Sequence, residues 1–177
     1  MAIRRKHIRR IVERLLEECK IEKPPVDVRR VARVLGATVR EAQAENDLSG
    51  FLHRIPGGDR VLIGVNRAHA PGRKRFTIAH ELGHLLLHGT EDFHVDKGFQ
   101  VYKRDARSTE GSDRSEIEAN LFAAELLMPV TFVVEDLRER EAIDLSKDDE
   151  LERLAKRYHV SPQAMTFRLA NLGYLTL

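Results

Sequence analysis

The spacing of apolar and polar residues divides the chain into a helical start, a middle of short strands and a helical remainder. Within residues 3–19, apolar side chains recur three or four positions apart with charges between them, which predicts an amphipathic helix. Residues 28–35 repeat this pattern over a shorter span. The segment KPPVD separates the two helices, and its last residue, Asp27, is a typical helix N-cap. The chain is therefore predicted to open with two helices.

The middle of the chain changes to short runs of β-branched and other apolar residues. Residues 37–42, 49–55 and 60–66 each have the length and composition of a strand. The segment PGGD, residues 56–59, connects the last two as a predicted hairpin turn. We expect a small three-stranded sheet.

Helical spacing returns in residues 74–88, 114–128 and 131–140. Between the first two helices, residues 90–113 are polar and contain glycines, which predicts a long loop. The fold expected from these elements is α+β, with the small sheet packed on helices.

The last 30 residues give two further helices, DDELERLAKRYHV and SPQAMTFRLANLG, with Ser161 as the N-cap of the second. We expect one domain over residues 1–130 and a helical, helix-turn-helix-like subdomain over residues 131–177. In such a motif Arg157, His159, Gln163 and Arg168 could contact DNA. Direct DNA binding is the less favoured interpretation, because the apolar positions alone explain a helical cap on the core.

Composition narrows the class of protein. The 177 residues suit one domain or one domain with a small appendage, and 30 basic against 28 acidic side chains leave a net charge of +2. This net charge does not by itself indicate a nucleic-acid-binding protein. The basic residues near the start are interpreted as a solvated helix face. The single cysteine, Cys19, excludes an internal disulfide, and no signal peptide or membrane-spanning apolar run is seen. A cytoplasmic protein with no membrane association is expected.

The segment FTIAHELGHLLLHG contains the candidate chemistry. His80 and His84 are four residues apart, so on a helix both can reach one ion, at Zn–N distances of about 2.0–2.1 Å. Glu81 lies one step around the helix, where a general base can take a proton from a water molecule whose pKa zinc lowers to about 7. The alternative is a pair of hydrogen-bonded core histidines. Gly83 favours the metal site, because a mid-helix glycine costs about 1 kcal/mol relative to alanine and is acceptable where another backbone approaches closely.

A catalytic zinc site needs a third protein ligand, and the helix 114–128 offers Glu116 and Glu118. These two lie about 200° apart around the helix, so both cannot face one ion. Glu116 shares its face with Asn120, which could accept the second ring N–H of a ligating histidine. Glu116 is therefore preferred and Glu118 is the alternative.

Other histidines and one tyrosine are candidates for supporting roles. His88 ends the motif helix, where a capping or second-layer role is expected. A developing oxyanion needs a donor, for which Tyr102 and His94 in the long loop are candidates, as are Arg75 and His88. For each of these four, a surface or packing role is the favoured alternative. By analogy with other zinc peptidases, substrate is expected to pair as an extended strand with a sheet edge, formed by 49–55 or 60–66.

The segments RFTIAHELGHLLLH and EIEANLFAAELLMP together resemble the ImmA/IrrE family of bacterial metallopeptidases, over about residues 25–130. The resemblance implies a zincin-like core of the gluzincin type, in which both motif histidines and a glutamate from the second helix hold one catalytic Zn²⁺. The family's ligand glutamate precedes a small polar or acidic residue by four positions, which here selects Glu116 with Asn120. Whether the ion in the cell is zinc or manganese is left open.

Members of this family are typically site-specific proteases that cleave helix-turn-helix repressors of the XRE class. The resemblance implies a zinc-dependent endopeptidase whose protein substrate is such a repressor on a separate chain, so that cleavage derepresses genes. The alternative function is a non-catalytic regulator or toxin–antitoxin component that binds DNA or a partner protein.

Overall fold

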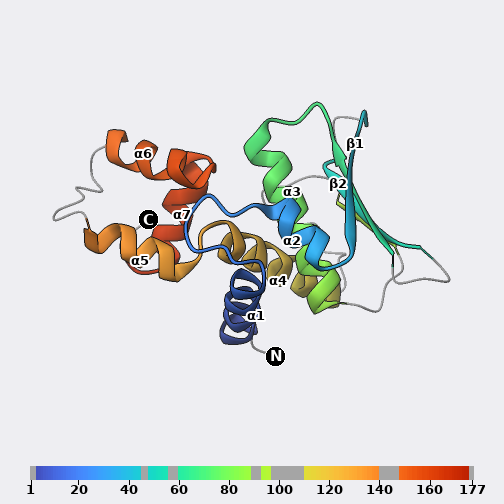
Figure 1. Ribbon diagram of the computed structural model, residues 1–177, viewed down its shortest axis with the longest axis horizontal. Coiled ribbons are helices and arrows are strands. Elements are labelled where there is room, and N and C mark those ends of the chain that lie inside the picture. The colour runs from blue at the N-terminus through green and yellow to red at the C-terminus, as the bar shows by residue number, and fades with distance from the viewer. Residues whose placement is uncertain are drawn as a thin grey trace.

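The computed structural model describes residues 3–44, 48–55, 60–88, 93–96, 110–139 and 148–175. Within these ranges the elements, in chain order, are α1 (Arg5–Glu18), α2 (Val28–Val34), β1 (Ala37–Ala42), β2 (Gly50–Arg54), β3 (Val61–Asn66), α3 (Pro71–Leu87), β4 (Phe93–Asp96), α4 (Glu110–Leu127), α5 (Val130–Glu139), α6 (Asp148–Tyr158) and α7 (Pro162–Asn171). Figure 1 shows the sheet at one end of the molecule and α5, α6 and α7 at the other, with α4 between them. The α+β class predicted from the sequence is confirmed.

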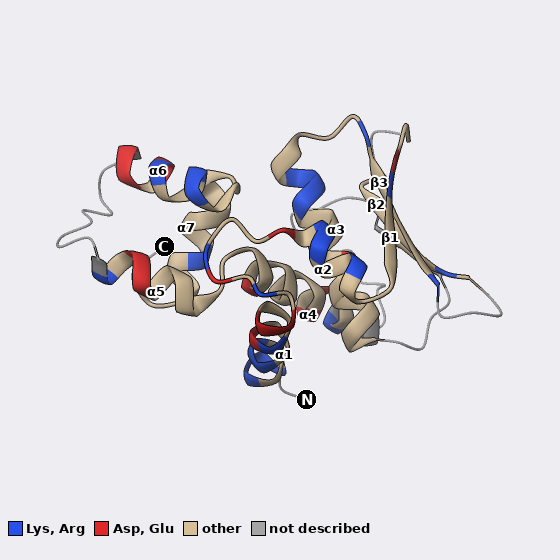
Figure 2. Cartoon of the chain, in the orientation of Figure 1, with Lys and Arg blue, Asp and Glu red and all other residues tan. Residues whose placement is uncertain are grey.

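The two N-terminal helices follow from local sequence signals. The carboxylate of Asp27 accepts hydrogen bonds from the backbone N–H groups of Arg29 and Arg30, both at 3.0 Å, which confirms it as the N-cap of α2. α1 buries the apolar stripe that includes Ile8 and Leu15 and leaves most of its charges in solvent. Figure 2 marks the Lys and Arg positions along α1 in blue.

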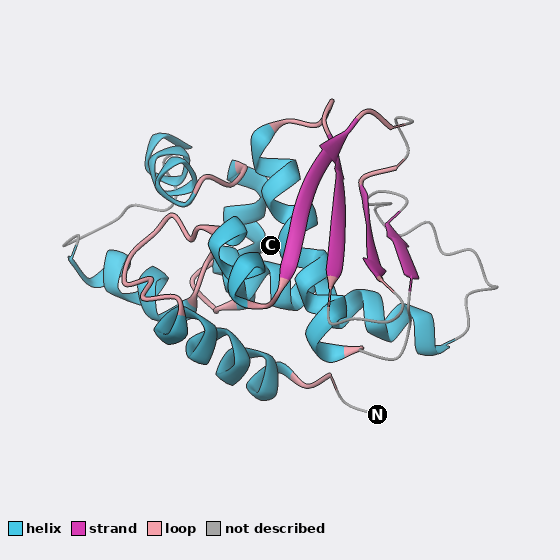
Figure 3. Ribbon diagram, turned by 45° about the vertical axis from the view of Figure 1, so that its right-hand side comes forward, coloured by secondary structure: helices cyan, strands magenta, loops and turns pink. Residues whose placement is uncertain are grey.

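The sheet has four strands in the order β1-β3-β2-β4. β1 runs parallel to β3, and β2 is antiparallel to both β3 and β4. Figure 3 shows the helices on one face of this sheet. β4 lies in the segment 90–113 that was predicted to be a loop, so the expected three-stranded sheet gains one edge strand. The predicted hairpin turn, residues 56–59, lies outside the described residues.

The sheet order corrects the prediction of the substrate-binding edge. β2 is hydrogen-bonded to β3 and β4, and β3 is hydrogen-bonded to β1 and β2. The strands formed by residues 49–55 and 60–66 are therefore internal strands of the described sheet, and neither is its edge. The described edges are β1 and β4, and β4 was not recognised because a four-residue strand is too short to show an alternating pattern.

The core is built where α3 packs on α4. Leu82 and Phe122, one from each helix, are fully buried at this contact. A Cβ atom placed on Gly83 would lie 3.0 Å from the Cα atom and 3.2 Å from the carbonyl oxygen of Ala119. This confirms the close backbone approach that the mid-helix glycine predicted. α3 itself begins at Pro71, three residues before its predicted start, because proline is favoured in the first helical turn.

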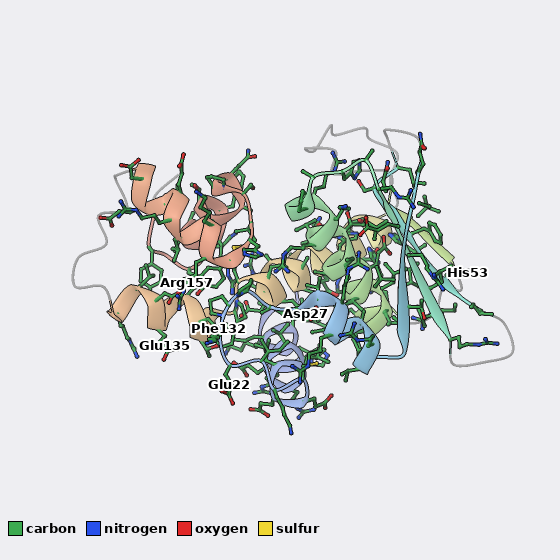
Figure 4. The ribbon with its side chains drawn as sticks, turned by 45° about the horizontal axis from the view of Figure 1, so that its top comes forward. Glu22, Asp27, His53, Phe132, Glu135 and Arg157 are labelled. Carbon is green, nitrogen blue, oxygen red and sulfur yellow. The ribbon has the colours of Figure 1, made fainter. Side chains whose placement is uncertain are left out.

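The C-terminal helices pack as a cap on this core. Arg168, expected as a DNA contact, is buried instead: its Nη2 donates to Glu125 at 2.6 Å and its Nε donates to the carbonyl of Met128 at 2.9 Å. Arg157 faces α5, as Figure 4 shows, and donates to Asp136 at 2.8 Å. Arg168 is thus buried, whereas Arg157 is 42% exposed and forms an ion pair at the surface. Both cations are paired with carboxylates of this chain, which weakens the electrostatic support for DNA binding by this pair. The boundary near residue 130 stays a prediction.

Among the described residues, no single helix has the length and hydropathy needed to cross a membrane. Residues 114–127 and 130–138 pass that test only when taken together, across a bend of 43°.

Candidate metal centre

Two histidines on the buried face of α3 form the base of the site. His80 and His84 are one turn apart, and they are 3% and 4% exposed. Their Nε2 atoms lie 3.0 Å from each other. Two imidazoles in this position can present lone pairs to one common point, because residues four apart share a helix face.

A carboxylate from α4 meets these two rings. Glu116 places Oε2 3.3 Å from Nε2 of His80 and Oε1 3.2 Å from Nε2 of His84. Burial raises the pKa of Glu116. The hydrogen bonds and charges of the two histidines lower this pKa by more than burial raises it, so the pKa lies well below its usual range. The carboxylate is therefore ionised, which is the form that a metal ion requires.

The other glutamate considered, Glu118, points to a different part of the protein. Its carboxylate is fully buried and accepts a hydrogen bond from Nη2 of Arg4 at 2.6 Å and another from Arg114 at 3.3 Å. The hydrogen bond from Arg4 is the main reason that the pKa of Glu118 falls to about 2. Of the two candidate carboxylates, the structure brings Glu116 to the histidines and leaves Glu118 in an ion-pair cluster.

Asn120 lies one turn after Glu116 and contacts the same site. Its Oδ1 is 2.9 Å from Nδ1 of His80. A carbonyl oxygen only accepts, so Nδ1 of His80 donates to Asn120 and Nε2 is the nitrogen whose lone pair a metal ion would take. This contact fixes the tautomer that metal binding needs.

A third histidine completes the cluster from the sheet. His94, on β4, places Nε2 3.5 Å from Oε1 of Glu116, and its ring stacks on that of His84 with 3.7 Å between centroids. Ligand atoms of His80, His84, His94 and Glu116 all lie within 4.8 Å of one another. His94 was expected only as an oxyanion donor, and its place among these donors could not be read from a segment assigned to a loop.

Glu81 follows His80 directly on α3, and its side chain is completely buried. It is thus held on the helix that carries both histidines, one step around from them. Successive residues of a helix point in different directions, so the carboxylate of Glu81 lies beside the two histidines and is not one of the clustered donors.

The remaining candidates lie further from the centre. His88 ends α3 with Nε2 3.7 Å from Oε2 of Glu118, and burial is the first cause that lowers its pKa. Arg75 donates to the backbone carbonyl of Val26 at 2.9 Å, on the side of α3 that faces the N-terminal helices. Tyr102 lies outside the described residues.

Sequence reasoning missed Arg4. Besides its bonds to Glu118, Arg4 reaches the carbonyl of Leu87 at the end of α3, at 3.4 Å. It therefore ties together the two helices that carry the cluster. Nothing in the sequence distinguishes Arg4 from the neighbouring Arg5 and Lys6, because only the folded chain brings it to Glu118.

The donor set was tested against the needs of a divalent ion. Ligand atoms about 2.0–2.1 Å from a tetrahedral centre are separated by about 3.4 Å. The two Nε2 atoms are 3.0 Å apart, and each has one oxygen of Glu116 near that separation, Oε2 at 3.3 Å from His80 and Oε1 at 3.2 Å from His84. Imidazole nitrogens with a carboxylate oxygen are typical ligands of zinc, and manganese also accepts carboxylates. The residues present fit a metal ion.

Comparison with known proteins also relates this chain to metal-dependent peptidases. The model of the IrrE N-terminal-like domain, a peptidase family, matches residues 32–170. The chain is 34% identical over 109 residues to the radiation response metalloprotease IrrE of Deinococcus radiodurans, and 29% identical over 132 residues to the metallopeptidase ImmA of Bacillus subtilis. It is also 28% identical over 122 residues to immunity region protein 2 of Bacillus phage phi105, which is uncharacterised.

These matches cover different shares of each protein. The alignment with IrrE spans 61% of this chain but 30% of IrrE, whereas that with ImmA spans 73% of this chain and 69% of ImmA. The phage protein is matched over 69% of this chain and 68% of its own length. Among solved structures, a Mycobacterium tuberculosis transcriptional regulator has the same fold over 93% of this chain and 46% of its own, with a TM-score of 0.64 and 18% identity.

Proposed function

This chain belongs to the ImmA/IrrE family of metallopeptidases, and on that premise we propose that it is a zinc-dependent, site-specific endopeptidase. The observation that carries the proposal is the convergence of His80, His84 and Glu116 from two packed helices, with separations suited to one tetrahedral ion. Family membership supports peptide-bond hydrolysis, and this donor set supports zinc as the ion.

The proposed ligands are the two histidines of α3 and Glu116 of α4. A bound zinc ion supplies Lewis acidity, which polarises a scissile carbonyl group and lowers the pKa of water. Asn120 holds His80 in the tautomer with a free Nε2 lone pair. The ionised state of Glu116 offsets part of the positive charge that the buried site would otherwise hold.

Glu81 is the proposed general base. Its carboxylate accepts a proton from the attacking water and donates that proton to the nitrogen of the leaving amine. Its complete burial on α3 keeps the carboxylate in one place and away from bulk solvent. These are the two properties that a positioned proton carrier requires.

The proposed substrate-binding edge is β4. This strand carries His94 into the cluster and pairs with β2 along one side, from Gly50 opposite Asp96 to His53 opposite Phe93. In the part of the chain that the structure describes, no strand pairs with its other side. An extended peptide pairing there would lie next to the metal ligands, which is the β-augmentation mode of binding.

The proposed substrate is a transcriptional repressor of the XRE class on a separate chain, and the reaction takes place in the cytoplasm. Support comes from the similarity to a phage protein whose name places it in an immunity region. The likeness to the mycobacterial regulator concerns the fold alone. Cleavage of such a repressor would remove it from its operator and switch on the genes that it controls.

The test uses a Glu81→Gln variant, which removes the base and keeps the shape of the side chain. Glu17→Gln on the exposed face of α1 is the matched control. Each protein is loaded with zinc, its metal content is measured, and it is incubated with purified XRE-type repressors from the same genome. We expect one specific cleavage by the wild type and by Glu17→Gln, and none by Glu81→Gln at equal zinc content. Cleavage by Glu81→Gln at the wild-type rate would rule out the proposed base, and no cleavage by the zinc-loaded wild type would rule out this substrate.

A further inference from the structure

The cluster holds one donor more than a catalytic zinc site uses. Catalytic sites keep three protein ligands and leave the fourth position open, whereas closed sites with four protein ligands are structural. Here three imidazoles and one carboxylate converge. Resting on the proposed function, we propose that His94 is a fourth, displaceable metal ligand, so that strand β4 closes the resting site.

The register of the sheet accounts for the direction of the His94 side chain. His94 pairs with Leu52, and side chains of paired residues lie on the same face of a sheet. Leu52 is 2% exposed, so this is the face covered by helices. The side chain of His53, the next residue along β2, points to the opposite face of the sheet, and Figure 4 shows it away from the helices. The pairing therefore directs the imidazole of His94 at α3 and α4 and not into solvent.

The contacts of His94 place it at donor distance from the cluster. Its Nε2 is 3.5 Å from Oε1 of Glu116, close to the separation of about 3.4 Å between two ligands of one tetrahedral ion. The ring lies against His84 at an interplanar angle of 26°. The side chain is 17% exposed, so little solvent competes for this nitrogen.

Of the four donors, His94 is the one whose release costs least. His80 and His84 belong to a 17-residue helix whose central turns are buried, and Asn120 also holds His80. Glu116 is the one anionic donor, so its loss would leave the ion's charge uncompensated in a buried site. His94 is neutral when it ligates, and it belongs to a four-residue strand at the edge of the sheet. Edge strands with few backbone pairs open at lower free energy than central elements.

The position of His94 on β4 couples the fourth coordination position of the metal ion to substrate binding. The same four residues carry His94 and form the edge that we propose for peptide pairing. A peptide strand that pairs with β4 can therefore shift this strand and release His94 in a single event. The resting enzyme would hold its metal tightly and open a position only when a suitable strand is bound.

The experiment compares the wild type with His94→Ala, and uses His53→Ala as the matched control on the adjacent strand. Each protein is stripped of metal, checked for folding by circular dichroism, and titrated with Zn²⁺ against a chromophoric chelator. A second titration with Co²⁺ follows the visible absorption, which reports the number and type of ligands. A His94→Gln variant gives the same readouts if the alanine variant does not fold.

We expect the zinc Kd of His94→Ala to rise by about tenfold or more. Its cobalt spectrum should change, and added imidazole should restore the wild-type spectrum by filling the vacated position. His53→Ala should match the wild type in both titrations. An unchanged zinc Kd and an unchanged cobalt spectrum in the His94 variants would overturn the inference and leave the proposed function standing. Failure of the wild type itself to bind either ion would overturn both.

Discussion

At the scale of single residues, the contact between His80 and Asn120 is the clearest test of how the site is oriented. Asn120 Oδ1 accepts the proton of His80 Nδ1 at 2.9 Å. Removing such a partner of a metal-ligating histidine lowers metal affinity by about 10–100-fold. We therefore expect Asn120→Ala to raise the zinc Kd by about tenfold or more, as measured by competition titration. Asn171→Ala, an exposed change at the end of α7, serves as the control. Equal zinc affinity in Asn120→Ala and the wild type would show that this contact does not orient the ligand.

Gly83 offers a second test at this scale, because it sets how closely α3 and α4 approach. An alanine Cβ would lie 3.0 Å from the Cα of Ala119 and 3.2 Å from the Cβ of Phe122, so backbone would have to move. Helix propensity favours alanine by about 1 kcal/mol, while overpacking costs about 1–3 kcal/mol. The cost of overpacking is expected to exceed the gain in helix propensity here, because the nearest atoms belong to the backbone of a buried helix. Gly83→Ala should lower the free energy of unfolding in urea.

The matched control for this change is Gly72→Ala in the same helix. Its nearest neighbour would be the carbonyl oxygen of His159 at 3.7 Å, which is an ordinary contact. Gly72→Ala should be neutral or stabilising. If both variants are equally stable, the close helix approach does not constrain this position.

At the scale of elements, Arg4 joins the start of α1 to both ligand-bearing helices. It donates to the buried carboxylate of Glu118 on α4 and to Leu87 at the end of α3. A hydrogen bond to a buried charged group contributes about 1.5–3 kcal/mol. Arg4→Ala should therefore lower the free energy of unfolding by about 2 kcal/mol. The exposed neighbouring change Arg5→Ala should remain within about 0.5 kcal/mol of the wild type. Urea unfolding followed by circular dichroism measures both, and equal stability of the two variants would contradict this role for Arg4.

The elements also show how far the sequence predicts this molecule. The helix that carries His80 and His84 was predictable, because apolar spacing and the motif agree over many residues. The helical angle showed that only one of Glu116 and Glu118 could face the ion, and Asn120 on the same face as Glu116 gave the preference. β4 was not predictable, because four residues give no period and their partner strand is about 40 positions earlier. The position of His94 depends on that pairing, so this donor was placed in the wrong kind of element. The buried state of Arg168 depends on its contact with Glu125, which no local pattern reveals.

At the scale of the whole molecule, metal binding and folding are expected to be coupled. The proposed ligands come from α3, α4 and β4, so only the folded chain assembles the site. A ligand that binds only the folded state stabilises it by about 2.7 kcal/mol at a concentration one hundred times its Kd. Zinc should therefore raise the melting temperature, and a chelator should lower it to that of the metal-free protein. Calcium, which prefers oxygen ligands, is the control and should have little effect. A melting temperature that zinc and chelator leave unchanged would contradict this coupling.

The central claim is that one divalent ion is held between α3 and α4 by two imidazoles and one carboxylate. Native mass spectrometry of the purified protein after exposure to zinc counts the ions bound to each chain. We predict one zinc ion for each wild-type chain, and a clearly lower zinc occupancy for His80→Ala, His84→Ala and Glu116→Ala under the same conditions. A wild-type chain that binds no zinc, or variants with the same zinc occupancy as the wild type, would contradict the claim.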